Sequence, residues 1–153
     1  MLKNWVHIGL PKTGTTTLQR HFFPEFDGTY ICTHTDQSDV GKADISQLKY
    51  TIIDSHDLEH DKHLHKARSF LENLDKPVLF SEEAIAAGIY NDQRVIAERI
   101  KALFGENTNI LVFIREQRDM LRSMYAQLSL GFSQKMHAVT FEEWSSPGLM
   151  DTV

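Results

Sequence analysis

Short apolar runs that alternate with longer amphipathic segments limit the possible folds of this chain more than any other feature. The predicted strands cover residues 4–9, 29–33, 77–80 and 109–114. The predicted helices cover residues 15–23, 57–74, 92–104 and 116–130, and residues 140–144 read as the start of one more. Strands that alternate with helices of about ten or more residues build βαβ units. We therefore expect a three-layer α/β fold with a mostly parallel central sheet of about four strands.

Two segments need a separate interpretation. The run NILVFI at residues 109–114 is apolar throughout, which is typical of a central strand covered on both faces. Residues 36–55 could be helical, because Ile45, Leu48 and Ile52 have helical spacing, or they could be partly extended.

Length and composition fit one globular domain. The chain has 153 residues, of which 41% are hydrophobic and 24% are charged. Its net charge is −5, so we expect no nucleic-acid surface. The sequence contains no apolar run of about 18 residues, which predicts no membrane span. Cys32 is the single cysteine, which excludes an internal disulfide and a cysteine zinc cluster and favours a cytoplasmic protein.

The histidines raise the question of a metal site. His56, His60 and His63 share one face if their segment is helical. The segment is otherwise polar, and a metal site usually takes ligands from a second element. We interpret it as a solvated surface helix and expect no bound metal.

The segment GLPKTGTTT at residues 9–17 is a candidate phosphate loop. It joins the first predicted strand to the first predicted helix and has the spacing of a P-loop, with four residues between its two glycines. Backbone N–H groups in such a loop form a concave nest for an anion, and the helix start adds partial positive charge. An ATP or GTP loop has lysine directly after the second glycine, but here that position is Thr15, and the lysine is Lys12. We therefore expect a P-loop-like fold whose ligand differs from ATP or GTP.

The stretch HIGLPKTGTTTL resembles the 5′-phosphosulfate loop of the sulfotransferases that use 3′-phosphoadenosine 5′-phosphosulfate (PAPS). The family loop reads approximately P-K-S/T-G-T-T after a strand, and residues 11–16 match it position by position. Thr17 stands where many cytosolic members have tryptophan, which points towards the bacterial or carbohydrate-type branches. The resemblance implies that the 5′-phosphosulfate side is held by five residues: Lys12, Thr13, Gly14, Thr15 and Thr16. It also implies that Lys12 stabilises the bridging oxygen as it leaves.

A second anion site is predicted where the strand 109–114 ends. Arg115 would present a planar guanidinium to a phosphate, and Ser123 follows eight residues later. This pair also resembles the family's 3′-phosphate motif, in which an arginine ends a strand and a serine lies eight residues on. The alternative is an ordinary charged start of a helix.

The third strand end carries the candidate base. Ser81, Glu82 and Glu83 follow the strand 77–80, and a carboxylate there could take the proton of an acceptor hydroxyl. The resemblance fits this choice, because several carbohydrate-acting members use a glutamate. We choose Glu82, with Glu83 in reserve. The alternative is that Ser81 caps a helix whose first turn holds both glutamates.

The resemblance implies a function for the whole chain. Residues 1–153 would form a single sulfotransferase-like domain that lacks the C-terminal part of the family fold. It would move the sulfuryl group of PAPS, its co-substrate, to a hydroxyl or amine of a small-molecule or carbohydrate acceptor, without a metal. A homodimer is one way to cover apolar surface where the missing part would pack.

Two other functions stay open. One is a P-loop small-molecule kinase that uses ATP, with Glu82 organising Mg²⁺. The other is a catalytically inactive nucleotide-binding remnant. A magnesium requirement would separate the kinase from the sulfotransferase.

Overall fold

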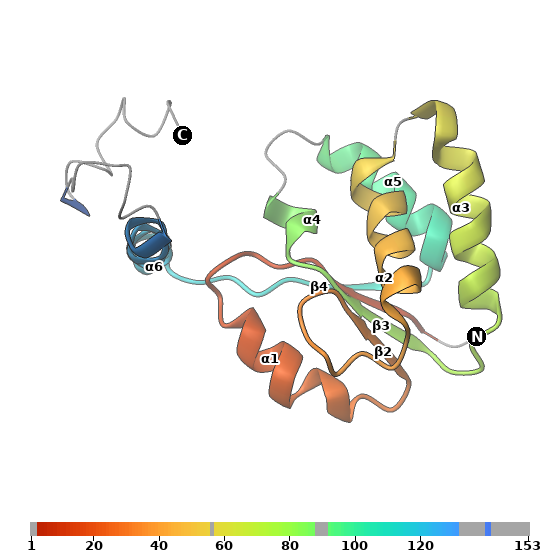
Figure 1. The fold of residues 1–153 in the computed structure, drawn as a ribbon, viewed down its shortest axis with the longest axis horizontal. Coiled ribbons are helices and arrows are strands. Elements are labelled where there is room, and N and C mark those ends of the chain that lie inside the picture. The colour runs from red at the N-terminus through yellow and green to blue at the C-terminus, as the bar shows by residue number, and fades with distance from the viewer. Residues whose placement is uncertain (1–2, 56, 88–91, 132–139, 142–153) are drawn as a thin grey trace. The chain divides into compact units, whose positions relative to one another are not determined.

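A computed structural model describes residues 3–55, 57–87, 92–131 and 140–141 (Figure 1). The chain divides into two units, Met1–Phe113 and Ile114–Val153, and each is described by itself. The first unit contains the sheet and the candidate phosphate loop, and the second contains Arg115 and Ser123.

The first unit is built on a sheet of four parallel strands. The strands are β1 (Trp5–His7), β2 (Thr29–Cys32), β3 (Val78–Ser81) and β4 (Asn109–Leu111). Their order is β2-β3-β1-β4, and every pair is parallel. The predicted α/β fold with a mostly parallel sheet of about four strands is thus confirmed.

The connections between strands are largely helical. They contain α1 (Thr15–His21), the 3₁₀ turn η1 (Phe23–Glu25), α2 (Lys42–Lys49), the π-helical turn η2 (Tyr50–Asp54), α3 (Asp57–Glu72), α4 (Ala84–Ala87) and α5 (Gln93–Phe104). The ambiguous residues 36–55 are therefore mainly helical, because Ile45, Leu48 and Ile52 all reach the core from consecutive turns.

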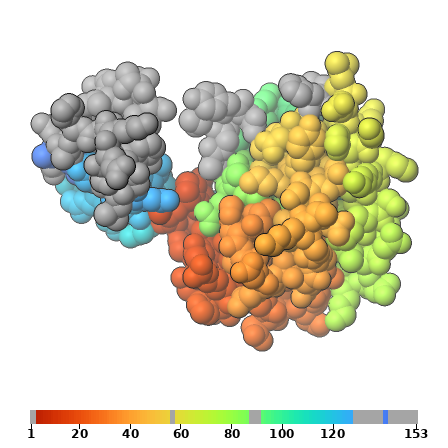
Figure 2. Space-filling view, in the orientation of Figure 1, coloured from red at the N-terminus to blue at the C-terminus, as the bar shows by residue number. Residues whose placement is uncertain are grey.

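The helices cover the two faces of the sheet unequally. In Figure 1, α1 lies on one side of the sheet and α2, α3 and α5 lie on the other. In Figure 2 the orange surface of α2 adjoins the yellow-green surface of α3. The result is the predicted arrangement of three layers, with right-handed crossovers expected for parallel strands.

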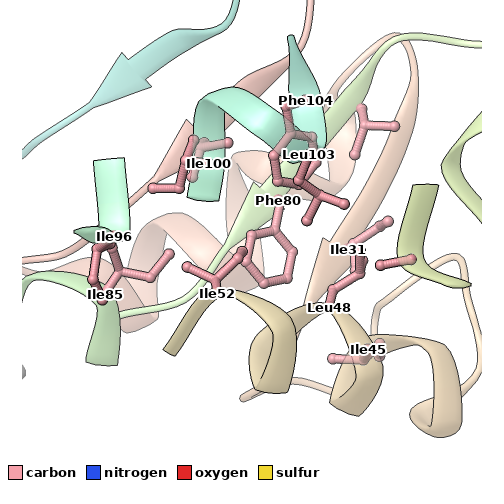
Figure 3. Close-up of a cluster of buried hydrophobic side chains, with 13 residues drawn as sticks. Ile31, Ile45, Leu48, Ile52, Phe80, Ile85, Ile96, Ile100, Leu103 and Phe104 are labelled. Atoms are coloured by element: carbon pink, nitrogen blue, oxygen red, sulfur yellow. The ribbon is translucent and has the colours of Figure 1, made fainter. Parts of the chain in front are cut away.

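Side chains alternate between the two faces of the strands. Val6, Ile31 and Phe80 point into the larger cluster, where Phe80 is wholly buried and stacks on Phe104 with ring centroids 5.9 Å apart (Figure 3). Tyr30 and Leu79 belong to the smaller cluster on the α1 side. This alternation follows from the period of two residues along a strand.

The strand 109–114 was predicted to be central and covered on both faces, and that prediction is wrong. In the part of the chain that the structure describes, β4 ends at Leu111 and lies at the edge of the sheet. Leu111 and Phe113 pack into the cluster on the α1 side, whereas Ile110 and Val112 are each 47% exposed. The apolar run therefore has one packed face and one open face. An edge strand of this kind is a potential pairing surface.

The second unit contains α6 (Gln117–Gly131). Within it Tyr125 packs edge-on against Phe141, with ring centroids 5.7 Å apart, and the Arg122 guanidinium lies 5.9 Å from the centre of the same ring. Residues 142–144 of the helix predicted at 140–144 lie outside the described residues.

Candidate functional site

The candidate phosphate loop leaves the carboxyl end of β1 and enters α1. Three of its residues have positive φ: Gly9 at 93°, Lys12 at 64° and Gly14 at 84°. Lys12 is the one non-glycine residue of the described chain with this conformation, which is uncommon for a side chain of its size. The Thr13 hydroxyl donates to the Leu10 carbonyl oxygen at 2.7 Å and closes the turn. The loop is therefore held in a specific shape, which is a requirement for an anion nest.

The loop lies against the start of the β3–α4 connection. A Cβ atom added to Gly9 would lie 3.0 Å from the Glu83 carbonyl oxygen, so this position excludes any side chain by space as well as by φ. The Glu82 N–H donates to the His7 carbonyl oxygen at 3.0 Å, and the Ala86 N–H donates to that of Ile8, also at 3.0 Å. The carboxyl ends of β1 and β3 are tied together by these contacts.

This place is the topological switch point of the sheet. From β1 the chain moves outward past β3 to form β2, and from β3 it crosses back past β1 to form β4. The two connections leave neighbouring strands in opposite directions. Open α/β sheets bind ligands in the crevice at such a point.

Glu83 is the carboxylate that contacts the loop. Thr15, only 3% exposed, donates its hydroxyl to Glu83 Oε1. The reserve residue of the sequence prediction is therefore the one beside the first turn of α1.

Glu82 lies on the other side of the same connection and is completely buried. Its Oε1 atom accepts the Ala84 N–H at 2.8 Å and lies 3.1 Å from His34 Nε2. Its Oε2 atom accepts the Thr33 hydroxyl at 2.5 Å and lies 3.3 Å from Lys49 Nζ. All four neighbours can donate to this carboxylate.

The environment keeps Glu82 ionised. Burial alone would raise the pKa of the carboxyl, but hydrogen bonds from Thr33 and Ala84 and the charges of Lys49 and His34 outweigh it and lower the pKa. A carboxylate with four donor neighbours and a lowered pKa is suited to holding those groups in place. Whether it also takes a proton from an acceptor stays a prediction.

Ser81 does not cap a helix, as the alternative interpretation supposed. It is the last residue of β3, and its buried hydroxyl is hydrogen-bonded to His7 Nδ1 at 2.8 Å and to Gln19 Nε2 at 3.0 Å. The carboxylate of Glu82 caps the start of α4 instead, through the Ala84 N–H. Burial lowers the pKa of His7 to about 4, so this imidazole is neutral at pH 7. The hydrogen bonds of Ser81 with His7 and Gln19 therefore connect β3 to β1 and to α1.

A pocket of about 650 Å³ opens beside the Glu82 carboxylate. Three of the groups around it, Thr33, His34 and Lys49, also touch Glu82. The pocket is lined by Arg20 of α1, by residues 32–37 at and after the end of β2, and by Lys42, Ile45, Ser46 and Lys49 of α2. Its volume is within the range of small-molecule sites, roughly 300–1,000 Å³.

Our sequence reasoning missed Thr33, His34 and Lys49. Thr33 and His34 follow the second strand, at the same edge of the sheet as the loop. The rule that ligands bind beyond the carboxyl ends of strands would have found them if it had been applied to that strand. Lys49 comes from a helix after the strand, and no local signal in the sequence marks it.

The predicted 3′-phosphate residues belong to the second unit. Arg115 is exposed and comes four residues after the end of β4, so it does not end the strand as expected. Ser123 is half-buried within α6. The role of this pair stays a prediction, because the second unit is described by itself.

Two histidines of the predicted helix face have local partners. His60 Nδ1 lies 2.8 Å from the Ser55 hydroxyl, and His63 Nδ1 lies 3.0 Å from Gln47 Nε2. His56, the third member of the predicted face, lies outside the described residues. Among the residues that the structure describes, no three His, Cys, Asp or Glu side chains gather in a way that could hold a metal ion.

None of the helices in the described ranges is both long enough and apolar enough to cross a membrane. Comparison of the chain with protein-family models, with curated proteins and with solved structures finds no match in any of the three.

Proposed function

We propose that this protein is a sulfotransferase that moves the sulfuryl group of PAPS to a hydroxyl or amine acceptor. The observation that carries the proposal is the loop at residues 9–17, whose residues 11–16 match the 5′-phosphosulfate motif. Its position at the switch crevice, with Lys12 inside the turn at φ 64°, supports the proposal. The lysine of the loop is Lys12, and the residue directly after Gly14 is Thr15, which favours a phosphosulfate over a nucleoside triphosphate.

The reaction is an in-line displacement in which positioning and charge neutralisation provide most of the catalysis, as in phosphoryl transfer. Backbone N–H groups of residues 13–16 bind the 5′-phosphate, and Lys12 stabilises the oxygen that leaves the sulfur. Arg115 and Ser123 bind the 3′-phosphate. Glu82 takes the proton of the acceptor, and Glu83 is the reserve candidate for this role. No step needs a metal.

A calorimetric titration with three nucleotides tests this function. Adenosine 3′,5′-bisphosphate, the product of the transfer, should bind at least about ten-fold more tightly than ADP or ATP, a difference of about 1.4 kcal/mol. ADP is the matched control, because it also carries two phosphates on one adenosine but places both on the 5′ side. Equal affinity for the bisphosphate and ADP would contradict the proposal.

One contact favours a second candidate, an ATP-dependent small-molecule kinase. In P-loop enzymes a loop hydroxyl and a carboxylate from a neighbouring strand hold Mg²⁺. Thr15, which stands at the lysine position of an ATP loop, donates its hydroxyl to Glu83, so Glu83 is the candidate in place of the Glu82 that the sequence suggested. The kinase predicts that ATP binding needs magnesium and that Glu83→Gln weakens this magnesium-dependent binding. Tight magnesium-free binding of the bisphosphate would instead favour the sulfotransferase.

We also propose a cytoplasmic location and a homodimer. Cys32 is buried with a free thiol, which fits the reducing conditions of the cytoplasm. A homodimer would cover the open face of β4, where Ile110 and Val112 are exposed. If no nucleotide binds, the chain is neither enzyme.

A further inference from the structure

The pocket beside Glu82 has the composition of a binding site for a small polyhydroxylated anion. Arg20, Lys42 and Lys49 line it, whereas Asp36 is the one acidic residue among the lining residues. The whole chain has a net charge of −5, so the excess of basic over acidic residues around the pocket is opposite in sign to the charge of the chain. A wall of this kind attracts an anion more than a neutral molecule.

The uncharged lining groups suit the rest of such a ligand. Thr33, Thr35, Gln37 and Ser46 offer hydroxyl and amide groups that can hydrogen-bond to hydroxyls of a ligand. Ile45 adds apolar surface on which a carbon skeleton can rest. A few polar groups around a small apolar area are typical of small-molecule sites.

Contacts with Glu82 explain why the side chains of His34 and Lys49 lie at the wall of the pocket. Its buried carboxylate holds His34 Nε2 at 3.1 Å and Lys49 Nζ at 3.3 Å, while both side chains also line the pocket. An ammonium has three N–H donors, so Lys49 can donate to Glu82 and to a ligand together. Isolated burial of a charge is unfavourable, and a buried ion pair seldom adds stability by itself. The arrangement instead fixes the direction of groups that face the pocket.

The pocket and the phosphate loop share structural elements. Arg20 belongs to α1, the helix that follows the loop. Glu82 and Glu83 are consecutive: the first holds the pocket wall, and the second accepts the Thr15 hydroxyl at the loop. A ligand in the pocket therefore lies beside the crevice in which the sulfuryl donor would bind.

We propose that this pocket is the acceptor site and that the acceptor is a small anionic polyol, such as a sugar that carries a carboxylate or a phosphate. The anionic group binds Lys42, Lys49 and Arg20. One hydroxyl oxygen attacks the sulfur and its proton passes to Glu82, the candidate base, while the bond from sulfur to the 5′-phosphate oxygen breaks and that oxygen leaves with the adenosine bisphosphate. The role of the pocket as an acceptor site rests on the proposed sulfotransferase function. The binding of an anion in the pocket does not.

Binding experiments on the full chain test the site without any transfer reaction. D-Glucose 6-phosphate and D-glucuronate are the probes, and D-glucose is the neutral control. By calorimetry we expect both anions to bind at least about ten-fold more tightly than glucose, a factor that corresponds to about 1.4 kcal/mol. In an amide NMR titration the largest shifts should fall in residues 32–37 and 42–49. Equal binding of glucose and its phosphate, or no binding of any probe, would overturn the proposal.

Substitutions locate the binding. Lys42→Ala and Arg20→Ala should each weaken glucose 6-phosphate binding several-fold, and neither side chain is buried. Lys62→Ala, an exposed lysine of α3 that does not line the pocket, is the matched control and should change nothing. If Lys62→Ala weakens binding as much as Lys42→Ala, the site is wrong.

The same titrations separate this inference from the proposed function. The probes should bind whether or not adenosine 3′,5′-bisphosphate is present, and Lys12→Ala should leave their affinity unchanged. If the bisphosphate displaces the probes, the pocket is part of the nucleotide site and the proposal fails. If the probes bind but the bisphosphate does not, the anion site stands and the sulfotransferase function fails.

Discussion

Replacing Glu82 by glutamine tests whether the buried carboxylate holds this edge of the sheet together. Glutamine has nearly the same shape, so the substitution removes the charge without leaving a cavity. Every group around Glu82 is a donor, from Thr33, Ala84, His34 and Lys49. An amide nitrogen cannot accept a hydrogen bond, so one side of the glutamine side chain would face donors that it cannot satisfy.

The magnitude follows from these contacts. A hydrogen bond to a charged group contributes about 1.5–3 kcal/mol and a neutral one about 0.5–1.5, so the two hydrogen bonds from the Thr33 hydroxyl and the Ala84 N–H lose roughly 1 kcal/mol each. His34 and Lys49 are 48% and 34% exposed, and each can turn to water, so each ion pair adds at most about 1 kcal/mol. Glu82→Gln should therefore lower the free energy of unfolding by roughly 2–4 kcal/mol.

Urea denaturation of the wild type and of two variants measures this value. Glu106→Gln is the matched control, because Glu106 is an exposed carboxylate whose Oε1 lies 2.9 Å from Lys101 Nζ. Its loss should cost less than about 1 kcal/mol. If Glu82→Gln is no more destabilising than Glu106→Gln, the carboxylate does not organise the site.

The effect should also depend on pH with a definite sign. The pKa of Glu82 is lowered from its ordinary value of 4.5 in the folded state, so the stability that the charge contributes is fully present above pH 4.5. It is lost as the pH falls through the lower folded-state pKa. The difference between wild type and Glu82→Gln should therefore shrink as the pH falls below 4.5. A difference that grows as the pH falls below 4.5 would refute the assignment of the charged form.

Three further predictions concern the loop, the nucleotide and the sheet edge. Lys12→Ala should lower turnover by about 10²–10³ with little loss of nucleotide affinity, whereas Arg115→Ala should mainly weaken nucleotide binding. Kinetics and calorimetry on both variants measure these effects, and equal effects of the two substitutions would contradict the assigned roles. Gly9→Ala should destabilise the fold by roughly 1–3 kcal/mol in urea, while Gly41→Ala, at φ −69° and with no atom closer than 3.7 Å, should be nearly neutral. Ile110→Lys should reduce self-association in analytical ultracentrifugation, and a wild type that stays monomeric at high concentration would contradict a dimer through β4.

The sequence predicted the fold well because its signals were local. Each parallel strand is a short apolar run between amphipathic segments, and that pattern alone identified all four strands. Residues 36–55 were ambiguous because their helical form depends on burial of Ile45, Leu48 and Ile52 against the sheet. The apolar run 109–114 gave the wrong position, because an unbroken run does not distinguish two covered faces from one.

In the candidate site, too, the local part was predictable from the sequence and the part that depends on long-range packing was not. The loop at residues 9–17 was visible because all of its parts are consecutive. The Glu82 cluster was not, since it exists only because β2 lies next to β3 in the order β2-β3-β1-β4. That order brings Thr33 and His34, nearly fifty residues earlier in the chain, beside the carboxylate. The carboxyl end of the second strand marks Thr33 and His34 as candidates, but strand order is set by long-range packing, so the sequence does not show that they contact Glu82.

Consecutive glutamates at the end of β3 give the two halves of the site different chemistry. The two glutamates follow the end of β3, at the turn into α4, and they have different neighbours. Glu83 accepts the Thr15 hydroxyl beside the loop, whereas Glu82 is enclosed by the donors of the pocket wall. The proposed sulfuryl transfer needs a nucleotide subsite and an acceptor subsite that meet at one point. We expect the end of β3 to be that point, because Glu82 and Glu83 are joined by a single peptide unit.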